Sequence, residues 1–205
     1  ENDPSWHLAA LNFWNNVANT RSVSIGGNSV RKNFHPVDDF SPMLSSEQGP
    51  ETCNSYNMLR LSEKLFMQDP QSRYIDFYER VMFNHILSSQ HPEKGGFVYF
   101  TPMRPQHYRV YSQPHENFWC CVGSGIENHA RYSQAIYATQ NDAIHVNLFV
   151  ASQLNWSDKN IRLIQHTRFP ESEKSQLKLE MSSAQSFALR IRQPHWLASE
   201  KMEVR

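Results

Sequence analysis

The sequence has no excess of either charge and no long hydrophobic run. Its 205 residues carry 20 Lys and Arg against 20 Asp and Glu, so the formal net charge is +0. Without a basic run to contact phosphates or anionic lipid, neither nucleic acid nor a membrane is an expected partner. No stretch approaches the roughly 18 apolar residues of a membrane-spanning helix, and the first residues lack the features of a signal peptide. An initiator methionine is also missing, so we expect a segment of a longer protein.

Cysteine is scarce as well, and its number is odd. A closed disulfide framework cannot use all three cysteines, so either one thiol is free or the three share another task. Aromatic residues, by contrast, make up 12% of the chain, and there are five Trp and ten His. This composition is typical of sugar-binding proteins, although aromatic side chains also fill cores. The 39% of hydrophobic residues is enough for one large domain or two small ones.

The first two thirds of the chain show helical periodicity. Apolar residues recur at helical spacing in four segments, which we predict as helices over 8–17, 50–66, 72–82 and 126–137. Residues 34–50 are rich in proline and lack such a period, so they predict a long ordered loop. A short strand is expected at 97–101, after Gly95 and Gly96.

The pattern changes to β after Asn141. Strand-like segments separated by turn residues predict four strands, over 143–150, 161–167, 177–181 and 186–192. We therefore expect an α+β chain with a domain boundary near residue 140.

The most informative pattern combines the three cysteines with one carboxylate. Glu51 and Cys53 stand at the predicted start of a helix, and Cys120 and Cys121 follow about seventy residues later at the entrance to another. Zinc binds cysteine sulfur and carboxylate oxygen in a tetrahedral arrangement, so these four residues are a plausible ligand set. Helix N-termini favour the thiolate forms that a metal needs.

Two other interpretations of the cysteines stay open at this point. Isolated cysteines are often small buried hydrophobic residues, and this long spacing is not that of a zinc finger. Cys120 and Cys121 could also form a vicinal disulfide, but that bond requires strained geometry and leaves Cys53 alone.

Several spaced motifs carry a resemblance to a known family. They are Gly26-Gly27-Asn28-Ser29-Val30, Phe34-His35-Pro36-Val37-Asp38-Asp39-Phe40, Gly49-Pro50-Glu51-Thr52-Cys53-Asn54, Glu116-Asn117-Phe118-Trp119-Cys120-Cys121-Val122-Gly123 and Glu127-Asn128-His129-Ala130, with Leu189-Arg190-Ile191 and Pro194-His195-Trp196 further on. In this order they resemble glycoside hydrolase families 127 and 146, the β-L-arabinofuranosidase-like group once described as a domain of unknown function.

The resemblance implies a fold and a set of roles. It implies the C-terminal part of an (α/α)6 barrel over 1–140, followed over 141–205 by antiparallel strands that begin a β-sandwich. It also implies a zinc ion held by Glu51, Cys53, Cys120 and Cys121 in a retaining glycoside hydrolase. Cys120 would be the nucleophile that attacks the anomeric carbon, in place of the usual carboxylate. His35 and Trp119 are the expected contacts to a carbohydrate substrate, which we expect to be a β-L-arabinofuranoside of plant glycans.

One residue departs from the family pattern. The general acid/base glutamate of the V-x-E-x-F motif corresponds to Lys32, within Val30-Arg31-Lys32-Asn33-Phe34. A lysine with an ordinary pKa of about 10.4 does not readily exchange protons near neutral pH. Substitute acids are Asp38, Asp39 and Glu47, although loop ordering is the commoner role for such residues.

Lys32 leaves alternatives to an active hydrolase. One is a non-catalytic, zinc-stabilised carbohydrate-binding relative, and another is a scaffold whose cysteine cluster is purely structural. His107, His115 and His129 are further residues that could contact a sugar, though single histidines are more often structural. The family resemblance favours a periplasmic or secreted location, where metal ligation would protect the thiols. The sugar, the linkage and the oligomeric state do not follow from the sequence.

Overall fold

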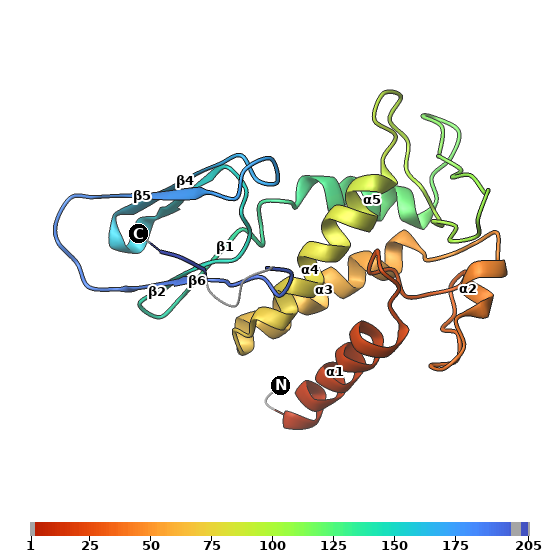
Figure 1. The fold of residues 1–205 in the computed structure, drawn as a ribbon, viewed down its shortest axis with the longest axis horizontal. Coiled ribbons are helices and arrows are strands. Elements are labelled where there is room, and N and C mark those ends of the chain that lie inside the picture. The colour runs from red at the N-terminus through yellow and green to blue at the C-terminus, as the bar shows by residue number, and fades with distance from the viewer. Residues whose placement is uncertain (1–2, 198–201, 205) are drawn as a thin grey trace. The chain divides into compact units, whose positions relative to one another are not determined.

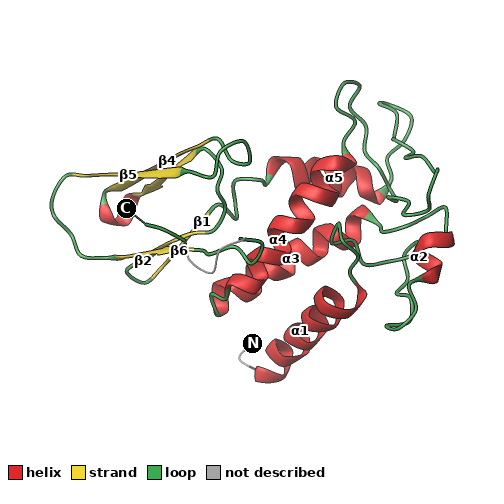
Figure 2. Ribbon diagram, viewed as in Figure 1, coloured by secondary structure: helices red, strands yellow, loops and turns green. Residues whose placement is uncertain are grey.

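The computed structural model describes residues 3–197 and 202–204 and divides the chain into two compact units, 1–132 and 133–205 (Figure 1). Helices make up the regular structure of the first unit, and the second contains two small sheets (Figure 2). The mixed α+β class that the sequence predicts is therefore confirmed. None of the described helices is both long and apolar enough to cross a membrane.

The described residues of the first unit form five α-helices, which are α1 (Pro4–Asn16), α2 (Ser41–Ser45), α3 (Thr52–Gln68), α4 (Ser72–Val81) and α5 (Cys120–Ala130). Helix α1 begins where the Asp3 side chain accepts a hydrogen bond from the Ser5 amide, with Pro4 at the first helical position. Helix α3 packs against α1, α4 and α5. Two π-helical turns, Val17–Arg21 and Met82–Ile86, continue α1 and α4.

The core of this unit is aromatic on one side of α3. The buried Trp14 ring meets Tyr74 and Phe77 edge to face, with centroids 4.8 and 5.6 Å away. Its indole N–H donates to Ser62 Oγ on α3 over 2.8 Å, so the polar edge of the ring is satisfied. These contacts fix α1 and α4 against α3, and two of the predicted metal ligands, Glu51 and Cys53, lie at the N-terminal end of α3.

Two predicted elements of this unit are wrong in detail. The helix predicted over 126–137 is α5, which begins at Cys120 and ends at Ala130. The segment predicted as a strand over 97–101 is extended but forms only isolated bridges, with Gln90, Tyr111 and Glu51. The long loop over 34–50 holds the short helix α2, and it is otherwise irregular.

In the part of the second unit that the structure describes, the strands form two three-stranded sheets. One has the order β1 (Tyr137–Gln140), β2 (Ala143–Val146), β6 (Ala188–Ile191), and the other has β3 (Ser152–Trp156), β4 (Ile161–Thr167), β5 (Ser175–Met181). All pairs are antiparallel except β2 and β6, which are parallel, contrary to the antiparallel arrangement expected throughout. Strands β1 and β3 were not predicted. The core of the unit is formed by Ile144, Val146, Trp156, Ile161 and Leu163.

Candidate metal centre

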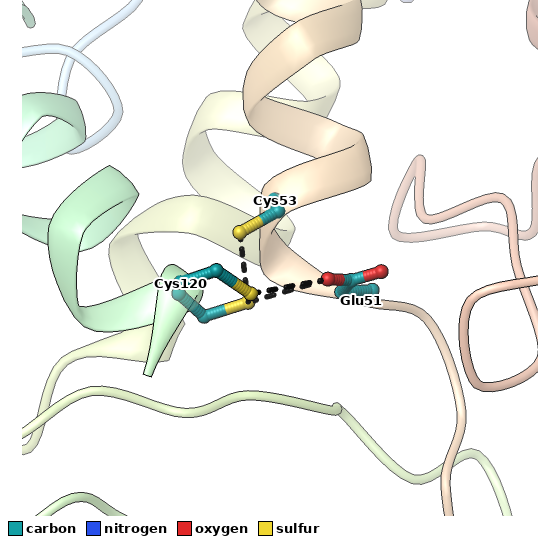
Figure 3. Close-up of side chains that lie close together, drawn as sticks. Glu51, Cys53 and Cys120 are labelled. Carbon is teal, nitrogen blue, oxygen red and sulfur yellow. Dashed lines mark hydrogen bonds between the residues drawn. The ribbon is translucent and has the colours of Figure 1, made fainter. Parts of the chain in front are cut away.

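The four predicted metal ligands meet between the N-terminal ends of two helices (Figure 3). Glu51 is the residue before α3, and Cys53 lies in the first turn of that helix. Cys120 and Cys121 are the first two residues of α5. Helix N-termini present unpaired amide groups and a partial positive charge, so both helices favour negatively charged ligands at this place.

The ligand atoms of Glu51, Cys120 and Cys121 have the spacing that a tetrahedral ion requires. Zinc–sulfur bonds of about 2.3 Å and a zinc–oxygen bond of about 2.1 Å place sulfurs about 3.8 Å apart and sulfur and oxygen about 3.6 Å apart. Glu51 Oε1 lies 3.6 Å from Cys120 Sγ and 3.8 Å from Cys121 Sγ, and the two sulfurs of the pair are 4.0 Å apart. All four ligand atoms lie within 4.8 Å of one another. The group can therefore hold a metal ion.

One edge of the group is shorter than a tetrahedral site requires. Cys53 Sγ lies 3.0 Å from Cys121 Sγ, so these two sulfurs would separate by less than 1 Å to accept an ion of this size. A disulfide has sulfurs about 2.05 Å apart, and none of the three cysteines, all of which the structure describes, forms one. The vicinal disulfide between Cys120 and Cys121 is thus not present.

The close contact between Cys53 and Cys121 shifts the pKa values of the two thiols in opposite directions. A hydrogen bond from the Cys121 thiol lowers the pKa of Cys53 to about 6, and the same contact raises the pKa of Cys121. Cys53 is therefore ready to be a thiolate near neutral pH even before a metal binds. A soft metal ion takes cysteine in this thiolate form.

The group of four ligand residues is buried on the side of Glu51 and Cys121 and open to solvent on the side of Cys120. Cys121 is completely buried and Glu51 is 5% exposed, whereas Cys120 is exposed. Cys120 Sγ lies 3.1 Å from the Tyr99 hydroxyl, and the Tyr99 and Trp119 rings are tilted by 52° with centroids 5.8 Å apart. The thiol that a ligand can reach is thus bordered by two aromatic rings, whose faces suit the flat side of a sugar.

Lys32 also lies at the open side of the group. Its ammonium nitrogen is 5.2 Å from the centroid of the Tyr99 ring, and the residue is exposed. The hydrogen bond with Tyr99 raises the pKa of Lys32 above its ordinary value. Lys32 is therefore a fixed positive charge beside the nucleophile candidate at neutral pH.

Three other predicted residues, His35, Asp39 and Glu47, lie in loops and have partners of their own. His35 is 4% exposed, and its Nδ1 and Nε2 lie 2.6 and 3.3 Å from the carbonyl oxygens of Pro36 and Arg21. Asp39 accepts from the Ser41 amide at the start of α2, and Glu47 pairs with Arg104. Both contacts order the loop, which is the commoner role expected of these two acids from the sequence. The role of His35 as a substrate contact stays a prediction.

Sequence reasoning did not single out Tyr99, although it touches both Cys120 and Lys32. Its only sequence signal is its place in the predicted strand 97–101, next to the E-T-C segment in space but not along the chain. The backbone bridge between Glu51 and Phe100 brings the two segments together. Such a pairing cannot be seen in the one-dimensional pattern.

The comparisons with known proteins identify the family to which this α+β chain belongs. Residues 1–134 match the model of the β-L-arabinofuranosidase GH127 catalytic domain, and residues 143–205 match that of the GH127 middle domain. The chain belongs to the GH127 β-L-arabinofuranosidase family. No curated protein matches it.

Solved structures share the fold of this chain. It is 21% identical to a GH127 β-L-arabinofuranosidase from Geobacillus stearothermophilus T6, with a TM-score of 0.74 over 96% of this chain and 33% of that one. A second GH127 β-arabinofuranosidase is 24% identical, with a TM-score of 0.73 over 95% of this chain and 31% of that one. A third structure, described as a glycoside hydrolase, is 19% identical, with a TM-score of 0.69 over 91% and 35% of the two chains. The chain thus spans about a third of the length of the proteins it resembles.

Proposed function

We propose that this chain carries the nucleophile and metal centre of a retaining glycoside hydrolase that acts on β-L-arabinofuranosides of plant glycans. The observation that carries the proposal is the exposed Cys120 thiol within a group of four ligand atoms that lie within 4.8 Å of one another. Membership of the GH127 family supports a carbohydrate substrate. The aromatic rings of Tyr99 and Trp119 beside Cys120 support Trp119 as a substrate contact.

In the proposed reaction the Cys120 thiolate attacks the anomeric carbon of the sugar. A carbon–sulfur bond forms while the bond to the leaving oxygen breaks, and water then attacks the same carbon and releases the thiolate. Two displacements at one carbon retain its configuration, as in glycosidases with a carboxylate nucleophile. Each displacement requires a proton transfer. In the first, the leaving oxygen gains a proton, and in the second, the attacking water loses one.

The metal of this proposal is zinc, held by Glu51, Cys53, Cys120 and Cys121. When bound, zinc keeps coordinating thiols deprotonated at neutral pH and fixes their positions. The protein supports the same state through the two helix N-termini that meet at the group. The longer family fold that we propose is an (α/α)6 barrel whose C-terminal part corresponds to residues 1–140, followed by a β-sandwich. Because plant glycans lie outside cells, we also propose a periplasmic or secreted location.

Lys32 favours a second candidate, a carbohydrate-binding relative without turnover. A lysine ammonium does not accept a proton near neutral pH, and it is a weak proton donor. It stands beside the Tyr99 ring at the open side of the group, where a leaving group would be expected. An ammonium in this place could still donate hydrogen bonds to sugar hydroxyls, so binding would survive the loss of catalysis.

Trapping and turnover in the complete protein test these two candidates. A haloacetamide-bearing L-arabinofuranose should alkylate Cys120, and excess free L-arabinose should protect it. Plain iodoacetamide is the control, because an exposed thiol reacts with it whether or not a sugar site exists. An adduct confined to Cys53 or Cys121 in peptide mapping would refute the assignment of the nucleophile.

Turnover is measured on an aryl β-L-arabinofuranoside and on a natural disaccharide. Release of arabinose that disappears in Cys120→Ser supports the hydrolase. Binding of the disaccharide in calorimetry, with no release from either substrate, supports the carbohydrate-binding relative.

A further inference from the structure

His85 lies outside the proposed ligand set, but it contacts the segments that build it. It belongs to the π-helical turn Met82–Ile86 that follows α4, and it is completely buried. Short π-helical turns within helices are rare and frequently occur at functional sites. The sequence pattern did not mark this histidine.

Both ring nitrogens of His85 are hydrogen-bonded. Nδ1 lies 2.7 Å from Ser55 Oγ, and Nε2 lies 3.1 Å from Thr101 Oγ1. A neutral imidazole has one donor and one acceptor nitrogen, and each hydroxyl can serve either of them. Burial lowers the pKa of His85 to about 4, in keeping with this neutral form. The ring therefore links α3 to the segment 97–101 without a buried charge.

The Ser55 and Thr101 hydroxyls, which His85 links, belong to residues that lie close in sequence to residues of the candidate site. Ser55 follows Cys53 by two residues, and Thr101 follows Tyr99 by two. The segments also run side by side, because the Thr52 amide donates to the Tyr99 carbonyl over 3.0 Å and the Thr101 amide donates to the Pro50 carbonyl over 2.9 Å. Glu51 lies between these two backbone bonds.

A third segment lies against the same imidazole. A Cβ on Gly27 would be 3.3 Å from His85 Nδ1 and 2.4 Å from Pro50 Cβ, so the backbone there touches both residues. Two residues further on, Ser29 Oγ accepts a hydrogen bond from the Glu51 amide over 3.1 Å. His85 is thus surrounded by the three segments that hold Glu51 and Cys53 in place.

We propose that His85 is a positioning residue for the metal centre. It fixes the first turn of α3, and with it Glu51 and Cys53, against the 97–101 and 26–29 segments, so that these two ligands face Cys120 and Cys121 on α5. This role rests on the proposed metal centre. Partners outside the ligand set commonly change metal affinity by roughly 10- to 100-fold. Because His85 acts through Ser55 and the backbone, we expect the lower side of this range.

The experiment measures zinc affinity of the complete protein by competition with a chromophoric chelator. His85→Phe keeps a ring of similar shape and removes both hydrogen bonds, and it should raise the zinc Kd about tenfold. Ile86→Val is the matched control, since it removes one methylene from the same buried turn and leaves the hydrogen bonds of His85 intact. Its Kd should stay within about twofold of the wild type, even where its melting temperature falls. The Co²⁺–thiolate absorption spectrum should change in His85→Phe and not in Ile86→Val.

Two further variants test the role if His85→Phe does not fold. Ser55→Ala and Thr101→Val each remove one of the two bonds, and each should raise the zinc Kd. Equal zinc affinities and Co²⁺ spectra in the wild type, His85→Phe, Ser55→Ala and Thr101→Val would overturn the positioning role while leaving the metal centre intact. A wild-type protein that binds neither ion would instead overturn the proposed metal centre itself.

Discussion

The two units of the chain use their buried polar side chains differently. In the helical unit the polar groups Ser29, Glu51, Thr52, Ser55, His85 and Thr101 are buried together around the metal centre and bonded to one another or to nearby backbone. The β unit also buries polar side chains, among them Gln165 and Arg192, but these donate to backbone carbonyls beside an apolar core of Ile144, Val146, Ile161 and Leu163 with the Trp156 ring. Its strand β4 alternates buried and more exposed residues in the usual manner of a sheet with one covered face.

Apolar burial and buried polar networks contribute to a protein in different ways. Apolar burial is non-directional and stabilises a fold in proportion to the area removed from water. A buried polar network has a fixed geometry, because each donor must meet an acceptor at a short distance and a suitable angle. The helical unit is therefore the part in which small shifts should change chemistry, whereas comparable changes in the β unit should change only stability.

The largest expected effect is the loss of metal from Cys53→Ala. The wild-type protein should contain about one zinc per chain, because three thiols and one carboxylate complete a tetrahedral set. Removing Cys53 should reduce the metal content nearly to zero. Elemental analysis of the purified protein gives the result directly.

Leu163→Ala is the matched change in the β unit. It removes a completely buried side chain and should lower the free energy of unfolding by about 2–5 kcal/mol without loss of zinc. Full metal content in Cys53→Ala, or metal loss in Leu163→Ala, would refute the expectation that only changes in the helical unit alter metal binding.

The second prediction concerns Lys32 and the missing carboxyl group. If Lys32 stands where the family has its general acid/base, Lys32→Glu in a complete protein should raise turnover of natural disaccharides at least about tenfold, a part of the roughly 10²- to 10⁴-fold that such catalysis contributes. Activated aryl substrates need less protonation of the leaving group and should gain less. Zinc content should not change, because Lys32 is not a ligand.

Efficient hydrolysis of natural glycans by the unaltered protein, with no gain in Lys32→Glu, would point to another acid. Asp38, Asp39 and Glu47 would then be the residues to replace.

The third prediction is a pH dependence that originates in the helical unit. The pKa of His85 is lowered to about 4 by burial first and by the Arg109 charge second, so the unfolded chain binds this proton more readily than the folded one. The stability that neutral His85 contributes is complete above about pH 6.5 and is lost as pH falls toward 4. The loss is about 3 kcal/mol.

Chemical denaturation at pH 7 and pH 4 tests this expectation. His85→Gln should have the smaller pH dependence, whereas His145→Gln in strand β2 should differ less from the wild type because burial lowers the pKa of His145 less. An identical slope in the wild type and His85→Gln would show that other groups cause the acid sensitivity.

The smallest effect is expected on the surface of the β unit. Glu180 on β5 pairs with Arg162 at 3.3 Å and with Lys178 at 2.6 Å; Arg162 and Lys178 are exposed, and Glu180 is partly exposed. Exposed ion pairs contribute little to stability. Glu180→Ala should therefore change the free energy of unfolding only slightly, and high salt should reduce the difference. A larger loss would mean that the surface of this sheet has a structural role beyond solvation.

Much of the fold was predictable because local pattern and burial agree. Strand β4 was predicted with its observed bounds, and the start of α3 follows from Pro50 and Glu51. Strand β3, with the sequence SQLNW, was missed because it has little apolar content to reveal its alternation. The start of α5 was missed because Gly123 and Gly125 lower helix propensity. Tertiary contact favours the glycine here, since a Cβ on Gly125 would lie 2.7 Å from the Phe97 ring.

The candidate metal centre was predictable in its members but not in its geometry. Residue chemistry alone suggested zinc, and the family motifs selected Glu51, Cys53, Cys120 and Cys121. Neither could indicate that Tyr99 would contact Cys120, or that His85 would link Ser55 to Thr101. These contacts join segments far apart along the chain, and no local pattern records them.

The parallel pairing of β2 with β6 has a consequence for synthesis on the ribosome. Residue Ala143 pairs with Ala188, 45 positions later, so one side of β2 has no partner until the β3–β5 segment and β6 have been made. All four residues of β2 are buried in the finished sheet. A nascent chain that ends before residue 188 therefore presents an apolar strand edge, the kind of surface that pairs with other chains and aggregates. Slow translation or early termination between residues 147 and 187 should make this protein dependent on chaperones, even though its folded form has this edge covered.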